Sequence, residues 1–357
     1  MKNSSPATCI VYATQIMPAK HVLIIGAGPI GLETAATLQE AGLSVTCVDE
    51  GPIGGTIYSL FPPMTRFFSS PERLAIAGID LQVAAQEKAT REEYLAYLRS
   101  VVHTRALPVK TYEKVTEANH DGRSWHVTTR GRGGQLSIHE ASHVVLAFGG
   151  THQSRRLGIP GEDLPHVDRH LGDPHRFFGR KVTIVGGKNS AAEAALRCWR
   201  VGAEVTIIHR GDGLHERVKY WIRPELQSLI DEGRVKACFN STVTSIEPDS
   251  IQVKTNGLEQ TIECQDVLVM IGYQQDPTLL KMFGVDYDGP QSAPVHDPVT
   301  MQTNSNAVYV AGTAIAGTQQ RFRTYIENCH VHGGRIAAAI LGNPPPPEVP
   351  ARVLPES

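Results

Sequence analysis

The sequence predicts an α/β protein with two Rossmann-like dinucleotide-binding domains, the second inserted into the first. The main observation is a repeated motif. An apolar strand, a glycine turn and a helix N-terminus follow one another in VLIIGAGPIGLETA (22–35), and the same order returns in KVTIVGGKNSAAEAAL (181–196). A second apolar strand follows each helix, at 43–48 and at 204–208, which completes two βαβ units.

The first glycine turn contains the residue types that a bound pyrophosphate requires. Gly26 permits the tight turn, Gly28 lets the pyrophosphate approach the backbone, and Gly31 lets the helix pack closely on the strand. The helix that begins beside Pro29 and Ile30 supplies amide donors and a positive dipole. We therefore expect a dinucleotide on this turn.

An acidic pair follows the second strand of this unit. The helix is expected over about 30–41, and the strand at 43–48 leads into Asp49 and Glu50. Asp49 lies 23 positions after Gly26, close to the roughly 20 expected for a carboxylate that binds the adenosine ribose. The acid at this distance strengthens the dinucleotide prediction.

The second glycine turn departs from the usual fingerprint. It consists of Gly186, Gly187, Lys188, Asn189, Ser190 and Ala191. Lys188 stands where the second glycine usually does, so its side chain crowds the pyrophosphate but places a cation beside it. Two such units in one chain predict two nucleotides.

Positive groups follow the second strand of this unit. The strand ends in His209 and Arg210, with no carboxylate at its end, and Arg217 follows further on. A ribose-binding acid would repel a 2′-phosphate, whereas these side chains would pair with it, so the sequence predicts NADPH rather than NADH. The alternative is that they are solvated charges at a strand end.

The remaining segments set the order of the domains. An apolar strand at 144–150 precedes a Gly- and Pro-rich crossing at 157–166, and the stretch at 266–277 closes the inserted domain. A strand over 307–317 then precedes a helix over roughly 325–341. The expected division is a flexible extension at 1–20, a first nucleotide-binding domain at 21–155 and 280–342, an NADPH domain at 156–279, and a proline-rich mobile tail at 343–357.

The composition excludes several classes of protein. Of 357 residues, 41% are hydrophobic and 20% charged, which is typical of a globular chain long enough for two or three domains. The net charge of -2 gives no bulk attraction to nucleic acid or to anionic membranes, so the expected partners are small molecules or proteins. No apolar run reaches the roughly 18 residues that span a bilayer.

The cysteines indicate a reducing compartment. Six are present, with no two closer than 26 residues, which fits neither a disulfide framework nor a zinc site. His330, His332 and Glu327 offer only three potential ligands, so we expect no metal site there. The N-terminal stretch makes a weak signal peptide, and we therefore expect a cytoplasmic protein.

The order of the motifs resembles a known group of flavoproteins. GAGPIG, LAFGG, IPGEDLP, VGGKNSA and YVAGT follow the pattern of the two-dinucleotide-binding flavoproteins of thioredoxin-reductase type, over about residues 20–342. Four longer stretches are similar to the bacillithiol-disulfide reductase (YpdA-type) family in particular. They are TIYSLFPPMTRFFSSPERLAIAGI (56–79), DPHRFFGRKV (173–182), VKYWIRPEL (218–226) and YIENCHVHGGRIA (325–337).

This resemblance implies cofactors and a reaction. The family's pattern implies FAD in the first site, NADPH in the second, a homo-oligomer (dimer or tetramer), and reduction of a low-molecular-weight disulfide in a bacterial cytoplasm. It also implies further FAD contacts beyond the first glycine turn and its acids. These are Thr65, Phe67, Phe68, Ser69, Gly149, Gly150, Gly312 and Thr313. Ordinary core packing is an equally good expectation for the two phenylalanines.

The chain departs from the family at its thiols. Members commonly place a cysteine in the first glycine turn, where the helix N-terminus would lower the pKa of the thiol so that it could attack a disulfide, and this chain has Ile30 there. No Cys-x-x-Cys pair occurs anywhere in the sequence. Cys329 is the remaining candidate for a redox role, with a packing role as its alternative.

Three functions therefore stay open. The first is an NADPH-dependent flavoprotein that reduces a bacillithiol-type disulfide. The second is a thioredoxin-reductase-like flavoprotein that passes electrons to a non-disulfide acceptor such as ferredoxin or a quinone, which Ile30 favours. The third is a non-enzymatic flavin or NADP(H) redox sensor, which only Lys188 favours.

Overall fold

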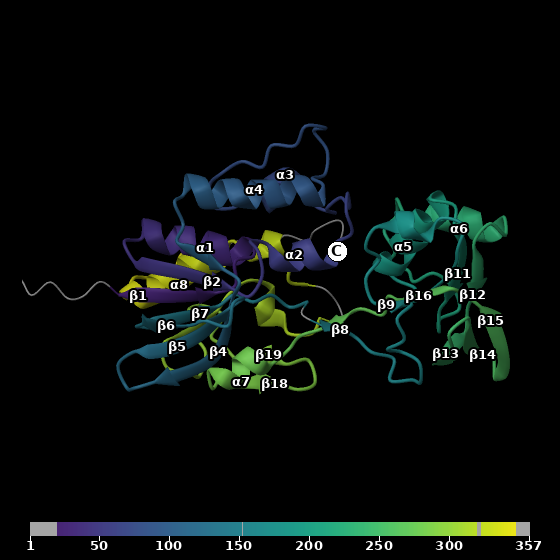
Figure 1. The fold of residues 1–357 in the computed structure, drawn as a ribbon. Coiled ribbons are helices and arrows are strands. Elements are labelled where there is room, and N and C mark those ends of the chain that lie inside the picture. The colour runs from purple at the N-terminus through teal and green to yellow at the C-terminus, as the bar shows by residue number, and fades with distance from the viewer. Residues whose placement is uncertain (1–19, 152, 320–322, 348–357) are drawn as a thin grey trace, which may run out of the picture.

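The computed structural model describes residues 20–151, 153–319 and 323–347. The described chain forms two α/β bodies joined by a narrow two-stranded ribbon (Figure 1). Each body contains a five-stranded parallel sheet and a three-stranded antiparallel sheet, which confirms the predicted pair of Rossmann-like units. Almost all of the expected N-terminal extension, and most of the proline-rich tail, lie outside the described residues.

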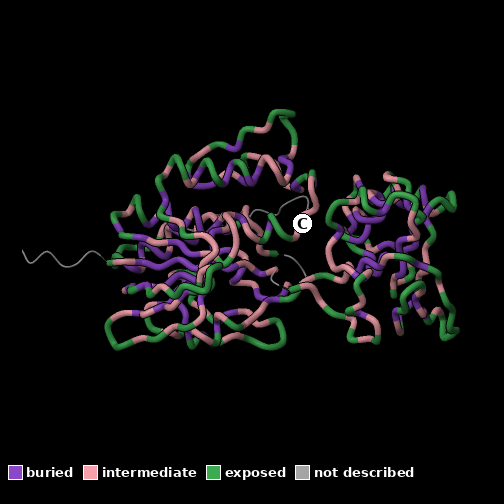
Figure 2. The backbone as a smooth tube through the Cα atoms, in the orientation of Figure 1, coloured by how far each residue is buried: buried purple, intermediate pink, exposed green. Residues whose placement is uncertain are grey.

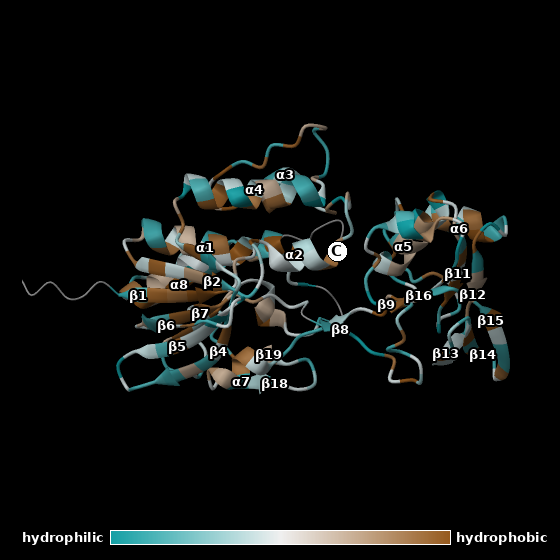
Figure 3. Ribbon diagram, viewed as in Figure 1, coloured by the Kyte–Doolittle hydropathy of each residue, from teal (hydrophilic) through white to brown (hydrophobic). Residues whose placement is uncertain are grey.

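The sheet of the first body has the strand order β20-β7-β1-β2-β3. The strands are β1 (His21–Ile25), β2 (Ser44–Asp49), β3 (Val109–Thr111), β7 (His143–Leu146) and β20 (Val308–Val310). Helices α1 (Pro29–Glu40) and α8 (Val331–Leu341) lie side by side. The central strand β1 is apolar because both of its faces are covered, as its buried and hydrophobic colouring shows (Figures 2 and 3).

Two further layers belong to this body. Between β2 and β3 the chain forms α2 (Gly55–Leu60), α3 (Pro71–Leu74) and α4 (Arg91–Thr104). Helix α4 begins with a capping box, in which Thr90 and Glu93 satisfy each other's backbone N–H groups. The antiparallel sheet consists of β4 (Glu113–His120), β5 (Trp125–Gly131) and β6 (Leu136–Ala141).

The second body repeats the design of the first. Its parallel sheet has the order β12-β11-β10-β16-β9. The strands are β9 (Val167–Asp168), β10 (Lys181–Val185), β11 (Glu204–Ile208), β12 (Lys236–Cys238) and β16 (Asp266–Val269). The helical elements are η1 (Pro174–Phe177), α5 (Asn189–Arg200) and α6 (Arg223–Asp231), and the antiparallel sheet is β13 (Ser241–Ile246), β14 (Ser250–Thr255) and β15 (Leu258–Glu263).

The ribbon between the bodies is made of β8 (Gln153–Ser154) and β17 (Tyr273–Gln274), which pair antiparallel (Figure 1). The chain therefore leaves the first body on one strand and returns on the other. After the return it forms α7 (Thr278–Met282) and a small hairpin of β18 (Tyr287–Asp288) and β19 (Ala293–Pro294) before it reaches β20.

Two expected elements near the C-terminus are shorter than predicted. The strand expected over 307–317 ends at Val310, because Gly312 has a φ of +71° and its N–H donates to His332 Nδ1. The chain then turns into the 3-10 segment η2 (Gly312–Ala316). The helix expected over 325–341 begins at Val331, after a separate 3-10 turn, η3 (Ile326–Asn328).

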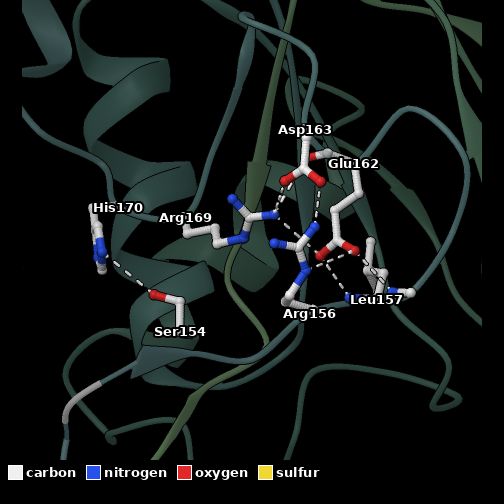
Figure 4. Close-up of polar contacts among 8 residues, drawn as sticks. Ser154, Arg156, Leu157, Glu162, Asp163, Arg169 and His170 are labelled. Carbon is white, nitrogen blue, oxygen red and sulfur yellow. Dashed lines mark hydrogen bonds and ion pairs between the residues drawn. The ribbon is translucent and has the colours of Figure 1, made fainter.

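A buried carboxylate stabilises the entry into the second body (Figure 4). Glu162 is 3% exposed and accepts hydrogen bonds from the backbone N–H groups of Leu157 and Gly158, at 2.7 and 2.8 Å. Arg169 Nη2 lies 3.4 Å from one of its oxygens and Arg156 Nε 3.7 Å from the other. Burial raises the pKa of Glu162, but these donors outweigh it and hold the pKa below its usual value.

Replacement of Glu162 by Gln is expected to destabilise the second body. The variant removes the buried one of the two carboxylates that pair with Arg156 and Arg169, which costs about 3 kcal/mol of unfolding free energy. A carboxyl whose folded pKa is lowered stabilises the fold above its ordinary pKa of 4.5 and loses that contribution as the pH falls through the folded value. Calorimetry should therefore show the full loss of unfolding free energy at neutral pH. Below about pH 4.5 the variant and the unmodified protein should become more nearly equal in stability.

Asp163→Asn is the matched control for this variant. Asp163 pairs with the same two arginines, but its side chain is 68% exposed. Exposed ion pairs contribute less than about 1 kcal/mol, so this variant should unfold close to the unmodified protein. Equal destabilisation by the two substitutions would contradict the role assigned to burial.

Candidate active site

A cavity of about 770 Å³ lies at the carboxyl edge of the first parallel sheet and reaches the second body. Gly26 and Gly149, which follow β1 and β7, line it, as do Ser190 and Glu193 of α5. The strand order reverses between β1 and β7, and ligands of open parallel sheets bind at such a point. The volume is within the range of small-molecule sites.

The first glycine turn fits a phosphate group at its backbone. A Cβ at Gly26 would lie 2.4 Å from the carbonyl oxygen of Ala147, and a Cβ at Gly31 would lie 1.9 Å from that of Gly26. The turn therefore requires glycine at both positions. A Cβ at Gly28 would meet no atom within 4 Å, so the backbone faces open cavity there. That bare backbone at the start of α1 suits a pyrophosphate.

Asp49 has a structural role in this turn. Its Oδ2 accepts from the N–H of Ala27 and its Oδ1 from the N–H of Gly51, both at 2.7 Å. The carboxylate thus fixes the backbone on either side of the cavity. Glu50 also lines the cavity, and its carboxylate lies 3.3 Å from Lys114 Nζ. The acidic pair predicted for the ribose therefore faces the cavity, with part of its bonding capacity used by the chain.

The structure brings the predicted FAD residues together. All of them line the cavity except Gly31, which packs against Gly26 instead. Phe67 lines the cavity and also packs in the core, where its ring centroid lies 4.6 Å from that of the buried Tyr94. Gly150 donates its N–H to Thr313 Oγ1 at 3.1 Å, which joins two of the predicted segments directly.

Polar contacts join the two bodies beside this cavity. Arg197 of α5 donates to the carbonyl oxygen of Pro63 at 2.6 Å and to Thr65 Oγ1 at 2.9 Å. The Thr65 hydroxyl in turn donates to Glu193 Oε1 at 3.3 Å. Burial raises the pKa of Glu193, and the nearby Arg197 and the Thr65 hydroxyl only partly oppose this rise. The segment predicted to cover the flavin is thus tied to the helix of the second nucleotide turn.

Aromatic contacts support the same junction. Phe68 of the first body meets Trp221 of the second edge to face, with ring centroids 5.8 Å apart. Lys219 Nζ lies 5.3 Å from the Phe68 ring and Lys88 Nζ lies 4.1 Å from the Trp221 ring. Phe68 therefore belongs to the boundary between the bodies rather than to the core of one.

The second glycine turn is covered by the segment that follows β11. A Cβ at Gly186 would lie 2.4 Å from the carbonyl oxygen of Met270, and a Cβ at Gly187 would lie 2.4 Å from the His209 ring. Burial and the neighbouring positive charges lower the pKa of His209. The His209 ring packs on the turn, and its lowered pKa weakens the case for a cation at this position, while Arg210 and Arg217 keep theirs.

A cluster of cations surrounds Lys188. Burial, together with Arg217, Arg155 and Arg210, lowers the pKa of this lysine. Within the described ranges no acidic side chain forms an ion pair with Lys188, Arg210 or Arg217. Concentrated positive charge of this kind fits a phosphate-bearing ligand. Of the predicted NADPH residues, Ser190 lines the large cavity.

Ile30 lies where a reactive thiol would be expected. It is 5% exposed, lines the cavity, and its Cβ would be 3.1 Å from a Cβ placed on Gly312. The side chain fills the space between the first turn and the 3-10 segment η2. The start of α1 therefore presents an aliphatic surface to the cavity.

No cysteine of the described ranges lines the cavity. Cys329 is fully buried, and burial, with Glu327 and Glu33, raises the pKa of its thiol. Burial also raises the pKa of Cys47, whose Sγ donates to the carbonyl oxygen of Gly26. These environments favour inert thiols, so the structure argues for the packing role of Cys329.

The histidines near the cavity are used by the fold. His330 contacts Glu33 at 2.8 Å through Nδ1 and the carbonyl oxygen of Arg73 at 3.0 Å through Nε2, and it joins α8 to α1 and α3. His332 Nδ1 accepts from the N–H of Gly312, and burial lowers its pKa to about 4. Among the described residues we find no group of three metal-ligating side chains, and no helix long and apolar enough to span a membrane.

Several cavity residues were missed from the sequence. Glu193 lies one turn after Ser190 on the same face of α5, a spacing that could have identified it. Glu113, Lys114 and Val115 follow β3, whose carboxyl end meets the same sheet edge as the glycine turn. The polar contact between Thr65 and Arg197 carried no sequence signal, because the two residues come from different bodies.

The comparisons with known proteins agree with this geometry. Residues 23–312 match the family described as pyridine nucleotide-disulphide oxidoreductase. The chain is 31% identical over 325 residues to bacilliredoxin reductase Bdr of Bacillus subtilis, which covers 91% of this chain and 98% of the relative. It is 28% identical to a ferredoxin–NADP reductase of Ignicoccus hospitalis, over 82% of this chain and 89% of the relative.

A solved structure shows the same similarity. Bacillithiol disulfide reductase Bdr (YpdA) from Bacillus cereus superimposes with a TM-score of 0.86 at 33% identity, and the match covers 91% of this chain and 99% of that one. The similarity therefore extends over both bodies.

The buried thiols lead to a labelling prediction. At pH 7 a thiol-specific reagent should modify Cys198, Cys264 and Cys329 at least about a hundredfold more slowly in the native protein than in denaturant. Burial is the cause, since it raises the pKa of Cys198 to about 12 and that of Cys264 to about 11. Peptide mapping by mass spectrometry measures the rates. Cys238, which is only half-buried, is the internal control, and native labelling of Cys329 ahead of Cys238 would refute the prediction.

Proposed function

Because this chain belongs to the pyridine nucleotide-disulphide oxidoreductase family, we propose that it uses FAD and NADPH to reduce a low-molecular-weight disulfide of the bacillithiol type. The observation that carries the proposal is the single cavity that extends from the first glycine turn to Ser190 and Glu193 of the second body. The name of the Bacillus cereus relative, bacillithiol disulfide reductase, supports this choice of substrate class.

The first body is proposed to hold FAD. The bare backbone at Gly28 and the N-terminus of α1 would bind the pyrophosphate, and the acids after β2 would lie by the ribose. Thr65, Phe68 and the Gly149-Gly150 turn would surround the flavin ring. These residues converge on one cavity, which is why we assign one ligand to them.

The second body is proposed to hold NADPH. The glycine turn that begins at Gly186 would bind its pyrophosphate beside Lys188. Arg210 and Arg217 would pair with the 2′-phosphate, and the His209 ring, which packs on Gly187, would support the turn. This cation cluster is the basis for choosing NADPH over NADH.

The overall reaction is NADPH + RSSR + H⁺ to NADP⁺ + 2 RSH. A bound FAD would carry the two electrons, since the cofactor supplies the redox chemistry and the protein supplies binding and orientation. Arg197 and Thr65 hold the two bodies together across the cavity. The raised pKa of Glu193 lets this carboxyl hold a proton at a higher pH than an exposed one.

We further propose that the disulfide is reduced without a covalent link to a protein cysteine. Ile30 offers no nucleophile, and no cysteine within the described part of the chain lines the cavity. The disulfide would therefore enter the cavity and take up its electrons there, rather than from a relay of protein thiols.

A non-disulfide acceptor such as ferredoxin or a quinone is the second candidate. The same thiol-free cavity favours it, and so does the ferredoxin–NADP reductase among the relatives. A purely non-enzymatic sensor does not account for the family to which the chain belongs.

The proposal extends to the cell compartment, the oligomeric state and the domain division of the enzyme. The resemblance of its motifs supports a bacterial cytoplasmic protein that acts as a homo-oligomer, a dimer or a tetramer. The ribbon of β8 and β17 supports the proposed division into an FAD domain, 21–155 with 280–342, and an NADPH domain, 156–279.

Arg217→Ala is expected to raise the KM for NADPH by about tenfold or more, because a charge-assisted bond to the 2′-phosphate contributes about 1.5–3 kcal/mol. The KM for NADH should not change. Steady-state kinetics with both nucleotides measures the difference. Arg200→Ala is the control, because Arg200 pairs with Glu225 on the surface of the same body. An equal effect of Arg217→Ala on both nucleotides would exclude the assigned contact.

Anaerobic reoxidation distinguishes the two acceptors. The protein reduced with one equivalent of NADPH should recover its oxidised flavin absorbance promptly after bacillithiol disulfide is added. The same reduced protein should stay reduced for longer with ferredoxin or a quinone. Prompt recovery with ferredoxin or a quinone, and none with the disulfide, would support the second candidate instead.

A further inference from the structure

The cavity has a carboxylate that the proposed function does not use. Glu113, at the start of β4, lines it next to Lys114 and Val115. We infer that Glu113 recognises the 6-amino group of the adenine of bound FAD, and that Thr129 and His139 orient it for this purpose. The inference rests on the assignment of FAD to the first body.

The position of Glu113 is at the adenosine end of the cavity. The backbone N–H of Tyr112 donates to the carbonyl oxygen of Gly51, just after the acids proposed for the ribose. Lys114 Nζ lies 3.3 Å from the Glu50 carboxylate. The start of β4 is therefore adjacent to the ribose site, whereas the residues proposed for the flavin ring belong to other segments of the chain.

Two partners hold the Glu113 side chain through the same oxygen. Thr129 Oγ1 donates to Oε2 at 2.7 Å, and His139 Nε2 lies 2.8 Å from that atom. Within the described residues, no hydrogen bond reaches Oε1. Thr129 is fully buried and the His139 side chain is 7% exposed, against 19% for Glu113. The buried pair thus fixes one oxygen of a residue that lines the cavity and leaves the acceptor capacity of the other oxygen for a ligand.

Glu113 is an acceptor at neutral pH. Burial raises the pKa of its carboxyl, but the hydrogen bonds from Thr129 and His139 outweigh this, and Lys110 adds to their effect. An ionised carboxylate only accepts hydrogen bonds, so it selects a ligand group that donates. The 6-amino group is the donor on that edge of adenine. A polar site of this type discriminates against a ligand that lacks the matching group.

The test compares two ligands on the full-length apoprotein. FAD and its analogue with purine in place of adenine, which lacks only the 6-amino group, are titrated by quenching of flavin fluorescence. The unmodified protein should bind FAD about tenfold more tightly than the analogue. Equal affinity for both would overturn the inference, and this result needs no variant.

Glu113→Gln tests the residue itself. Thr129 and His139 favour an acceptor at the oxygen they hold, so the amide N–H₂ group of Gln would point to the ligand and meet another donor. The variant should lose the tenfold preference for FAD. The control is Glu117→Gln, an exposed position on the same strand, which should keep it. Retention of the preference by Glu113→Gln would overturn the inference.

These outcomes are separate from failure of the proposed function. If the unmodified protein binds neither flavin, the FAD assignment fails, and with it the premise of the inference. If it binds FAD but does not distinguish the analogue, the proposed function stands and only the role of Glu113 is lost.

Discussion

The site depends on a backbone turn that allows no side chain at two positions. At Gly31 a Cβ would lie 1.9 Å from the carbonyl oxygen of Gly26, and at Gly26 a Cβ would lie 2.4 Å from that of Ala147. These close approaches bring β1, α1 and the end of β7 together, and Asp49 fixes the turn through two backbone amides. The start of α1 then faces the cavity, with the bare backbone at Gly28 available to an anion.

The junction between the bodies extends the cavity from the first glycine turn to Ser190 and Glu193 of the second body. Arg197 and Thr65 form hydrogen bonds across it, and Phe68 packs on Trp221. In a protein that needed a thiol pair of its second domain at the flavin, such a junction would have to open. This chain has no Cys-x-x-Cys pair, and Ile30 fills the position of the family's cysteine. A junction closed by direct contacts and a thiol-free cavity are therefore consistent with each other.

Sequence patterns predicted those parts of the fold that depend on residues close together in the sequence. The βαβ units follow from apolar runs and glycine spacing, and nearly all residues assigned to FAD converge on the cavity. Longer-range contacts were not predictable in this way. The strand expected to continue to 317 ends at Val310, where the N–H of Gly312 donates to His332 of the distant helix α8. Glu113 and its two partners lie on three strands of a separate sheet, and the charge of His209 depends on burial against Gly187.

The most direct measurement is the intact mass of the polypeptide, taken by acid quench and mass spectrometry during turnover with NADPH and bacillithiol disulfide. Reduction without a protein thiol predicts the unmodified mass at every time point while the disulfide is consumed. A species heavier by one bacillithiol, formed and lost at the rate of turnover, would contradict the thiol-free route and identify the cysteine that carries it.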